Sequence, residues 1–177
     1  MAIHSLGQSQ TAGKRFTFDK AEKLSTVIPI GWKTSERPPS DTMYGGFEYK
    51  DQSASVFFTK AVLSDQASAM SDVIEGIIQT YENTENFNVS NYGKITTGEV
   101  AGPDKKWPAV FTSFDVDMSL IARDPEAPPR DVTFRFYIMV FETSSQAYVI
   151  QGSAMKPVVQ GREKDIFSIM KNTIAQP

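Results

Sequence analysis

One apolar run is typical of a β-strand that is covered on both faces. Residues 130–145 read R-D-V-T-F-R-F-Y-I-M-V-F-E-T-S-S, and the middle of this run, Phe136–Phe141, is apolar at every position. Successive side chains of a strand point to opposite sides of the sheet, so both sides of this strand must be shielded from water. The pattern therefore predicts a sheet that lies between helices.

Two other segments have the three- and four-residue spacing of amphipathic helices. The first is predicted to begin at Ser64 or Asp65, whose short side chains can cap a first turn, and to end near Glu85. Gly76 lies inside it, and close approach of the helix to the sheet would explain this glycine. The second is predicted from about Gln160 to Ile174. The apolar stripes are Met70, Val73, Ile74, Ile77, Ile78 and Tyr81 in the first helix, and Ile166, Ile169, Met170, Thr173 and Ile174 in the second.

Alternating patterns predict seven strands around these helices. Three come before the first helix and four lie between the two helices, and an extended segment, Leu24–Trp32, is broken by Pro29 and turned at Gly31. The predicted strands are 15–18, 46–50, 54–62, 90–99, 109–120, 132–142 and 147–155.

Reflecting the chain about Pro125 predicts how the strands 109–120 and 132–142 pair. Phe114 then faces Phe136 and Val116 faces Phe134 on one side of the sheet, with Met118 facing Val132, and Asp115 faces Arg135 on the other. Apolar pairs on one face and opposite charges on the other favour this register. Reflecting the following hairpin about Ser145 sets Gly152 against Ile138 and Ala154 against Phe136, where small residues would let a helix lie close.

These patterns predict an α+β protein, a three-layer α/β/α sandwich with a mostly antiparallel seven-stranded sheet and one helix on each face. The chain of 177 residues is expected to form one domain over residues 15–177, after a flexible N-terminal lead over residues 1–14. That lead, M-A-I-H-S-L-G-Q-S-Q-T-A-G-K, has the polar, small-residue composition of a linker. It favours an exported protein, periplasmic or secreted, whose signal segment is absent. An ordinary cytoplasmic terminus is the alternative.

Composition narrows the classes of partner. The net charge is −3 and Lys and Arg are scattered, so no basic patch predicts nucleic-acid binding. No stretch approaches the roughly 18 apolar residues that a membrane span needs. The chain has no cysteine, which excludes disulfides, thiolate metal sites and a cysteine nucleophile.

The polar residues predict no catalytic, cofactor-binding or metal-binding set. The single histidine, His4, lies in the lead, where a general base cannot be held against its proton. Asp115 and Asp117 share one strand face and could hold a hard cation, but pairing of Asp115 with Arg135 is the favoured interpretation. No glycine-rich phosphate loop is present, and no pair of carboxylates is singled out by its spacing.

Aromatic residues and proline-rich loops are the candidates for a partner-binding surface. The loops are 34–43 and 121–129. Packing in the core or at its rim is the alternative role of the aromatic rings. The residues predicted to contact a partner are Trp32, Tyr44, Trp107, Arg123 and Pro125.

The segment Phe16-Thr17-Phe18, followed by Val27-Ile28-Pro29-Ile30-Gly31-Trp32, resembles the opening of PsbP-like proteins. That superfamily includes the photosystem II subunit PsbP, a Ran-binding nuclear import factor, periplasmic lipoproteins and chaperones of secreted toxins. The resemblance covers 16–174 and implies the three-layer fold and a non-catalytic, protein-binding role. No functional residue set of the superfamily matches this sequence.

The sequence therefore predicts a non-enzymatic protein-interaction module, exported from a bacterium, that is a monomer or a homodimer and whose partner is another protein. A cytoplasmic chaperone or adaptor for secreted effectors, acting as a homodimer, is the first alternative. A hydrolase with paired carboxylates is the second, and it requires a deep pocket holding two unpaired acids.

Overall fold

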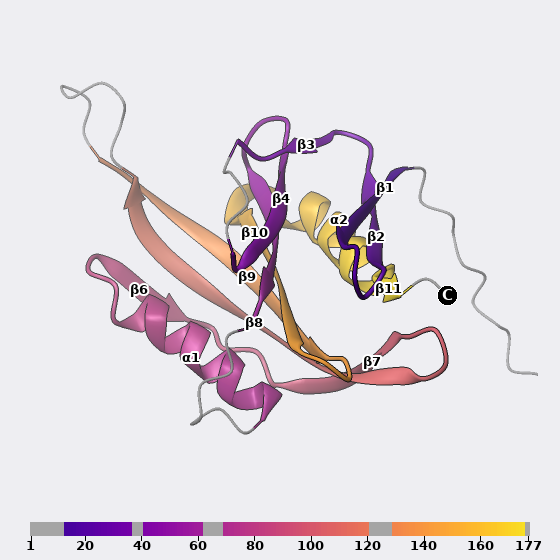
Figure 1. Cartoon of the computed structure of the whole chain (residues 1–177). Helices are drawn as coiled ribbons and strands as arrows, with labels where there is room; N and C mark the ends of the chain where they lie inside the picture. The colour runs from indigo at the N-terminus through magenta and orange to yellow at the C-terminus, as the bar shows by residue number, and fades with distance from the viewer. Residues whose placement is uncertain (1–12, 37–40, 62–68, 121–128, 176–177) are drawn as a thin grey trace, which may run out of the picture.

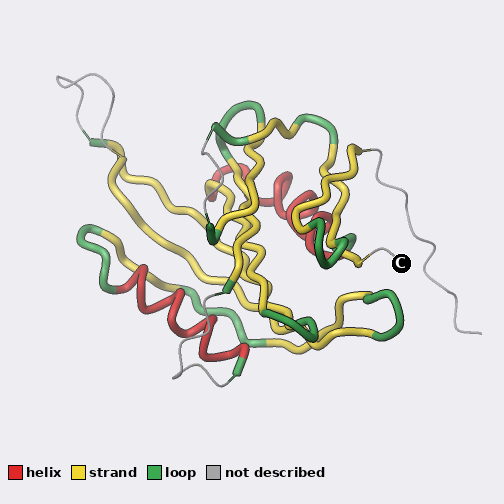
Figure 2. The backbone as a smooth tube through the Cα atoms, in the orientation of Figure 1, coloured by secondary structure: helices red, strands yellow, loops and turns green. Residues whose placement is uncertain are grey.

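The computed structural model describes residues 13–36, 41–61, 69–120 and 129–175, which form eleven strands, two α-helices and a short 3-10 helix (Figures 1 and 2). The α+β class, the two helices and the mostly antiparallel sheet agree with the prediction. The elements are β1 (Gly13–Asp19), β2 (Leu24–Pro29), β3 (Trp32–Thr34), β4 (Met43–Tyr49), β5 (Ala54–Lys60), α1 (Met70–Glu82), β6 (Phe87–Ser90), β7 (Thr96–Ala101), β8 (Lys106–Leu120), β9 (Arg130–Glu142), β10 (Ala147–Met155), η1 (Lys156–Val158), α2 (Val159–Lys171) and β11 (Ile174–Ala175).

The strand order is β1-β2-β11-β7-β8-β9-β10-β5-β4-β3, and β6 also pairs with β8. Every pairing is antiparallel except that of β11 with β7. The strand number exceeds the predicted seven because the uncounted segment Leu24–Trp32 forms two strands, one predicted strand is replaced by two, and β11 follows α2. Leu24–Trp32 divides at Ile30 and Gly31 into β2 and β3, and the segment predicted at 90–99 divides into β6 and β7.

The register predicted for β8 and β9 is confirmed. Phe114 faces Phe136, Val116 faces Phe134, Met118 faces Val132 and Asp115 faces Arg135. The prediction for the β9–β10 hairpin is wrong by one residue, since Gly152 faces Tyr137 and Ala154 faces Arg135. The cause lies in the four-residue loop 143–146, which the Thr143 amide closes by donating to the Gln146 carbonyl at 2.9 Å. The symmetry axis of the hairpin therefore falls between Ser144 and Ser145.

The two faces of β9 belong to two separate apolar clusters. Phe136, Ile138 and Val140 pack with Ile74 of α1. Tyr137, Met139 and Phe141 pack with Ile166, Ile169 and Met170 of α2. Only 1% of Tyr137 and 8% of Met139 is exposed. Figure 1 shows α1 on one side of the long β8–β9 pair, and α2 with the β1–β2 hairpin on the other.

The β1–β2 hairpin shares the α2 side of the sheet and adds aromatic side chains to its core. Phe18 stacks on Phe58 of β5 with ring centroids 4.9 Å apart. The hydroxyl of Thr26 in β2 donates to the carbonyl oxygen of Ile169 in α2 at 2.6 Å. The hairpin and α2 therefore cover this face together.

Two predictions about the helices are wrong, and a third falls on residues that the structure does not describe. The predicted caps Ser64 and Asp65 lie outside the described residues. Thr173 and Ile174 follow α2 instead of belonging to it, and Ile174 pairs in β11. Gly76 is exposed in α1 and a Cβ there would meet nothing within 4 Å, so close approach to the sheet does not explain this glycine.

No helix among the described residues is long and apolar enough to cross a membrane.

Gly152 marks the closest approach of α2 to the sheet, because a Cβ at this position would lie 2.4 Å from Cγ2 of the buried Ile166. We expect Gly152→Ala to lower the free energy of unfolding by about 1–3 kcal/mol, since neither the strand nor Ile166 has room to move. Gly76→Ala is the matched control and should raise this free energy by about 0.5–1 kcal/mol. Urea denaturation of the two variants measures both effects, and equal stability of the two would contradict the packing described here.

Candidate binding cleft

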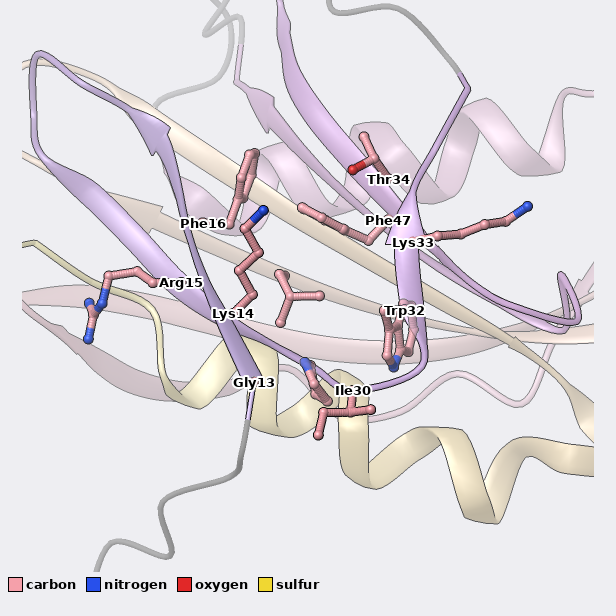
Figure 3. Close-up of a pocket in the computed structure, with 11 residues that line it drawn as sticks. Gly13, Lys14, Arg15, Phe16, Ile30, Trp32, Lys33, Thr34 and Phe47 are labelled. Carbon is pink, nitrogen blue, oxygen red and sulfur yellow. The ribbon is translucent and has the colours of Figure 1, made fainter.

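A cleft of about 540 Å³ opens between the β1–β2 hairpin and the β3–β4 hairpin. We call it the Trp32 cleft and define it by its lining: Gly13–Phe16, Ile28–Ile30, Trp32–Thr34 and Phe47. Figure 3 shows β1 on one side of the cleft and β3 on the other, with Phe16, Phe47 and Trp32 between them. Segments from three parts of the chain therefore build one concave surface.

The turn Ile30-Gly31 positions the two sides of the cleft. Gly31 has a φ of +95°, a backbone conformation that favours glycine, and a Cβ there would lie 3.0 Å from the ring of Tyr49. The turn carries the chain from β2, near one end of the strand order, to β3 at the other end. Among the described strands, β1 pairs only with β2 and β3 only with β4. Each strand beside the cleft therefore keeps one edge unpaired.

Aromatic side chains form the floor of the Trp32 cleft. The rings of Phe16 and Phe47 meet edge to face, with centroids 4.7 Å apart. Trp32 is held from two sides: its Nε1 donates to Oδ2 of Asp165 in α2 at 3.0 Å, and its ring lies against Tyr49 at 5.9 Å. At the rim, 78% of Ile30 is exposed. The cleft thus presents an apolar surface whose central ring is already oriented before any ligand binds.

The charged residues that line the cleft are all cations: Lys14, Arg15 and Lys33. Figure 3 shows the Lys14 side chain directed over the cleft, and Arg15 and Lys33 directed away from it on either side. The Arg15 guanidinium donates to the Ser25 hydroxyl at 3.0 Å. Neither lysine forms a salt bridge within the described part of the chain. The local charge is positive although the whole chain carries −3.

Of the five residues predicted to contact a partner, the three that the structure describes do not lie on one surface. Trp32 lines the cleft, and Tyr44 is half-buried against Phe18. Trp107 is a core residue with 5% of its surface exposed, and it packs in the cluster beneath α2. Arg123 and Pro125 lie outside the described residues. Lys14 and Arg15 were not among the predicted residues, although a basic pair that leads into an alternating aromatic strand was a usable signal.

Tyr44 belongs to a polar cluster beneath the β1–β2 turn. Tyr148 donates its hydroxyl to Oδ2 of Asp19 at 2.8 Å, and Nε2 of Gln146 donates to the Tyr44 hydroxyl at 2.8 Å. Burial raises the pKa of Asp19, but hydrogen bonds from the Glu22 amide and the Tyr148 hydroxyl outweigh it and leave that pKa below its ordinary value. Burial and the bond to Asp19 raise the pKa of Tyr148. This cluster fastens β1 to β10 and leaves Tyr148 protonated at neutral pH.

The carboxylate considered as a metal ligand, Asp115, is fully engaged by cations and an amide. Only 1% of this residue is exposed. Nη1 of Arg135 lies 3.0 Å from its Oδ1, Nζ of Lys156 lies 2.8 Å from its Oδ2, and Asn91 donates to Oδ2 at 2.7 Å. Asp117 accepts hydrogen bonds from Thr133 and Asn88 instead of sharing a ligand with Asp115. Within the described ranges, no three His, Cys, Asp or Glu residues group to hold a metal ion.

Similarity to solved structures identifies the fold. The chain matches the solution structure of a cyanobacterial PsbP from Synechocystis with a TM-score of 0.61, at 10% identity, over 98% of this chain and 99% of that one. It is also similar to a Bacteroides thetaiotaomicron structure, with a TM-score of 0.53, at 12% identity, over 93% of this chain and 49% of that one.

The Ran-binding protein Mog1p of Saccharomyces cerevisiae matches with a TM-score of 0.50, at 10% identity, over 93% of this chain and 96% of that one. No protein-family model and no curated protein matches the sequence. The resemblance to PsbP-like proteins is therefore confirmed for the fold alone.

The Asp115 cluster predicts how stability depends on pH. Burial raises the pKa of Asp115, but bonds from Lys156 and Asn91 and the charge of Arg135 outweigh it and hold that pKa below its ordinary value. The ionised form therefore stabilises the native state above pH of about 4, and this contribution is lost as the pH falls further. Asp115→Asn should lower the free energy of unfolding at pH 7 by about 2–4 kcal/mol and flatten its fall in acid. Denaturant titrations between pH 3 and pH 7 measure the stability and its dependence on pH. If the stability of the variant falls in acid as steeply as that of the natural chain, Asp115 does not cause this fall.

The two tryptophans should differ in their contact with solvent ions. In Trp107→Phe, where Trp32 alone emits, iodide should quench the fluorescence, whereas in Trp32→Phe the buried Trp107 should be protected. The cations around the cleft concentrate anions, so adding Lys14→Glu and Lys33→Glu should reduce iodide quenching of Trp32 by roughly twofold at low salt. Quenching by neutral acrylamide should not change. If the two lysine substitutions reduced quenching by iodide and quenching by acrylamide equally, the cleft would not be cationic.

Proposed function

We propose that this chain is a non-enzymatic protein-interaction module that binds an extended segment of a protein partner in the Trp32 cleft. The single observation that carries the proposal is an apolar cleft with a pre-oriented tryptophan, bordered by the unpaired edges of two strands. Such a site offers both main-chain hydrogen bonds and pockets for side chains.

The unpaired edges favour an extended occupant. The backbone amides and carbonyls on the outer edges of β1 and β3 have no partner strand among the described residues. An added strand satisfies such groups, which is why exposed sheet edges recruit extended peptides. Specificity then comes from alternate side chains, which point into the cleft.

The lining favours a partner that is both apolar and acidic. Phe16, Trp32 and Phe47 form a surface on which a large apolar side chain can anchor, since buried aromatic residues carry much of the energy of interfaces. Lys14, whose side chain is directed over the cleft, favours Asp or Glu beside this anchor. We therefore infer a motif in which one aromatic or large aliphatic residue is flanked by carboxylates.

Two further observations support a binding role over catalysis. Asp115 and Asp19, two buried carboxylates, are held by cations and hydrogen-bond donors, so neither is placed to act on a substrate. A protein of similar fold, Mog1p, is described as Ran-binding. Export from the cytoplasm remains part of the proposal.

Selection from a displayed library of random linear peptides on the immobilised full chain tests this function. We expect convergence on peptides with one large apolar residue next to Asp or Glu, and binding of the selected peptides should weaken with added salt. Trp32→Ala with Lys14→Glu should abolish it. Lys105→Glu with Lys164→Glu, which alters exposed lysines away from the cleft lining, should not. Selection without a consensus, or a consensus that binds the Trp32→Ala, Lys14→Glu variant unchanged, would overturn the proposal.

A further inference from the structure

A second hollow, of about 760 Å³, lies on the opposite face of the sheet beside α1. We call it the α1 groove. Its lining includes the aromatic residues Phe57, Tyr81, Phe87 and Phe134 and the acidic residues Glu36 and Glu48. Phe87 and Phe134 belong to the cluster under α1, whereas Phe16 and Phe47 of the Trp32 cleft belong to the cluster under α2. The two hollows are therefore separated by the sheet.

The α1 groove exists because α1 covers only part of its face. The helix packs on β6, β8 and β9. Beyond β9, residues of β10, β5 and β4 continue the lining, among them Gln151, Phe57 and Glu48. In Figure 1, α1 lies beneath β6 and the β8–β9 pair, while β4 lies on the far side of β9 and β10. Among the described residues, this part of the sheet face is not covered by a helix.

The sheet formed by β9, β10 and β5 beneath this groove cannot accept an added strand. β9 pairs with β8 and β10, β10 pairs with β9 and β5, and β5 pairs with β10 and β4. Their main-chain donors and acceptors are used within the sheet, unlike those at the edges of the Trp32 cleft. An occupant must therefore bind through side chains, as a helix does when it packs on a sheet.

The rings that would receive such a helix are already positioned. Nε2 of Gln151 donates to the Tyr81 hydroxyl at 2.6 Å. The Tyr81 ring lies 4.7 Å from Phe136 and 6.1 Å from Phe87, between centroids. Fixed aromatic surfaces lose little conformational entropy when a partner binds, so they suit an interface.

Charge identifies the partner. No lysine or arginine is among the residues that line the α1 groove. Glu36 and Glu48 are the charged residues of its lining, and Lys33 of β3 pairs with Glu48 of β4 beside it. A helix with an apolar stripe and a basic flank complements this surface, whereas an acidic helix would be repelled.

We propose that the α1 groove docks an amphipathic, basic helix of a protein partner beside α1. This interface lies on the other face from the Trp32 cleft and takes a ligand of opposite charge, so the chain can join two partners at once. Its failure would leave binding in the Trp32 cleft untouched.

The probe is a fluorescein-labelled peptide of roughly 14 residues with Leu on one helical face and Lys on the other, followed by fluorescence anisotropy with the full chain. We expect saturable binding. A peptide with Glu in place of every Lys should not bind, and neither should the Lys peptide with a central proline, because proline breaks the helix. Equal binding of the proline peptide would overturn the helical occupant, and equal binding of the Glu peptide would overturn the role of charge.

Variants locate the interface. Glu36→Lys with Glu48→Lys should weaken binding at least about tenfold, and the milder Glu36→Gln with Glu48→Gln should weaken it about threefold if the reversed-charge pair fails to fold. The matched control is Asp104→Lys with Glu142→Lys, which makes the same change in net charge at exposed residues outside the groove and should change affinity less than about twofold. Equal losses in both pairs would show attraction to net charge alone and would overturn the proposal. The peptide selected for the Trp32 cleft should bind all these variants normally.

Discussion

The burial of one strand on both faces is the constraint on which the rest of this structure depends. Each apolar side chain of β9 gains about 1.5–3 kcal/mol when it leaves water, so neither face can stay open along Phe136–Phe141. One helix cannot serve both faces. The odd-numbered residues pack on α2 and the even-numbered residues on α1, and both sets are buried. Gly152 then matters because it lets Ile166, and with it α2, reach the sheet.

What the helices leave uncovered determines where the molecule can bind. Two helices of 13 residues each cannot cover both faces of a sheet of eleven strands. On the α2 side the β1–β2 hairpin fills much of the remainder, and the Trp32 cleft is the gap between this hairpin and β3. On the α1 side no second element among the described residues shares the layer, and the α1 groove is the result. Both hollows follow from the same incomplete coverage, and the first is bordered by the unpaired edges of β1 and β3.

The sequence was sufficient where one local pattern determined the answer. The register of β8 and β9 was predictable because Asp115 and Arg135 fall on one face while Phe114 and Phe136 fall on the other. The β9–β10 register was not, because a loop of similar polar residues does not show whether its axis lies on Ser145 or before it. The Trp32 cleft could not be predicted from the sequence for a different reason. It joins residues 13–16, 28–34 and 47 through long-range packing, and nothing local distinguishes the half-exposed Trp32 from the buried Trp107.

The net charge of the chain was the least informative quantity for predicting partners. It sums charges that the fold places on different surfaces. A total of −3 suggests a mildly acidic surface without preference. The fold instead gathers Lys14, Arg15 and Lys33 at one cleft, and it gathers Glu36 and Glu48 at a groove beside a helix that carries three more acids. Beyond about 10 Å, salt screens one surface from the other, so a partner responds to the nearby charges and not to the sum. Two oppositely charged hollows on opposite faces of one sheet can therefore act independently, and for this chain the sign of the local potential separates one partner from the other.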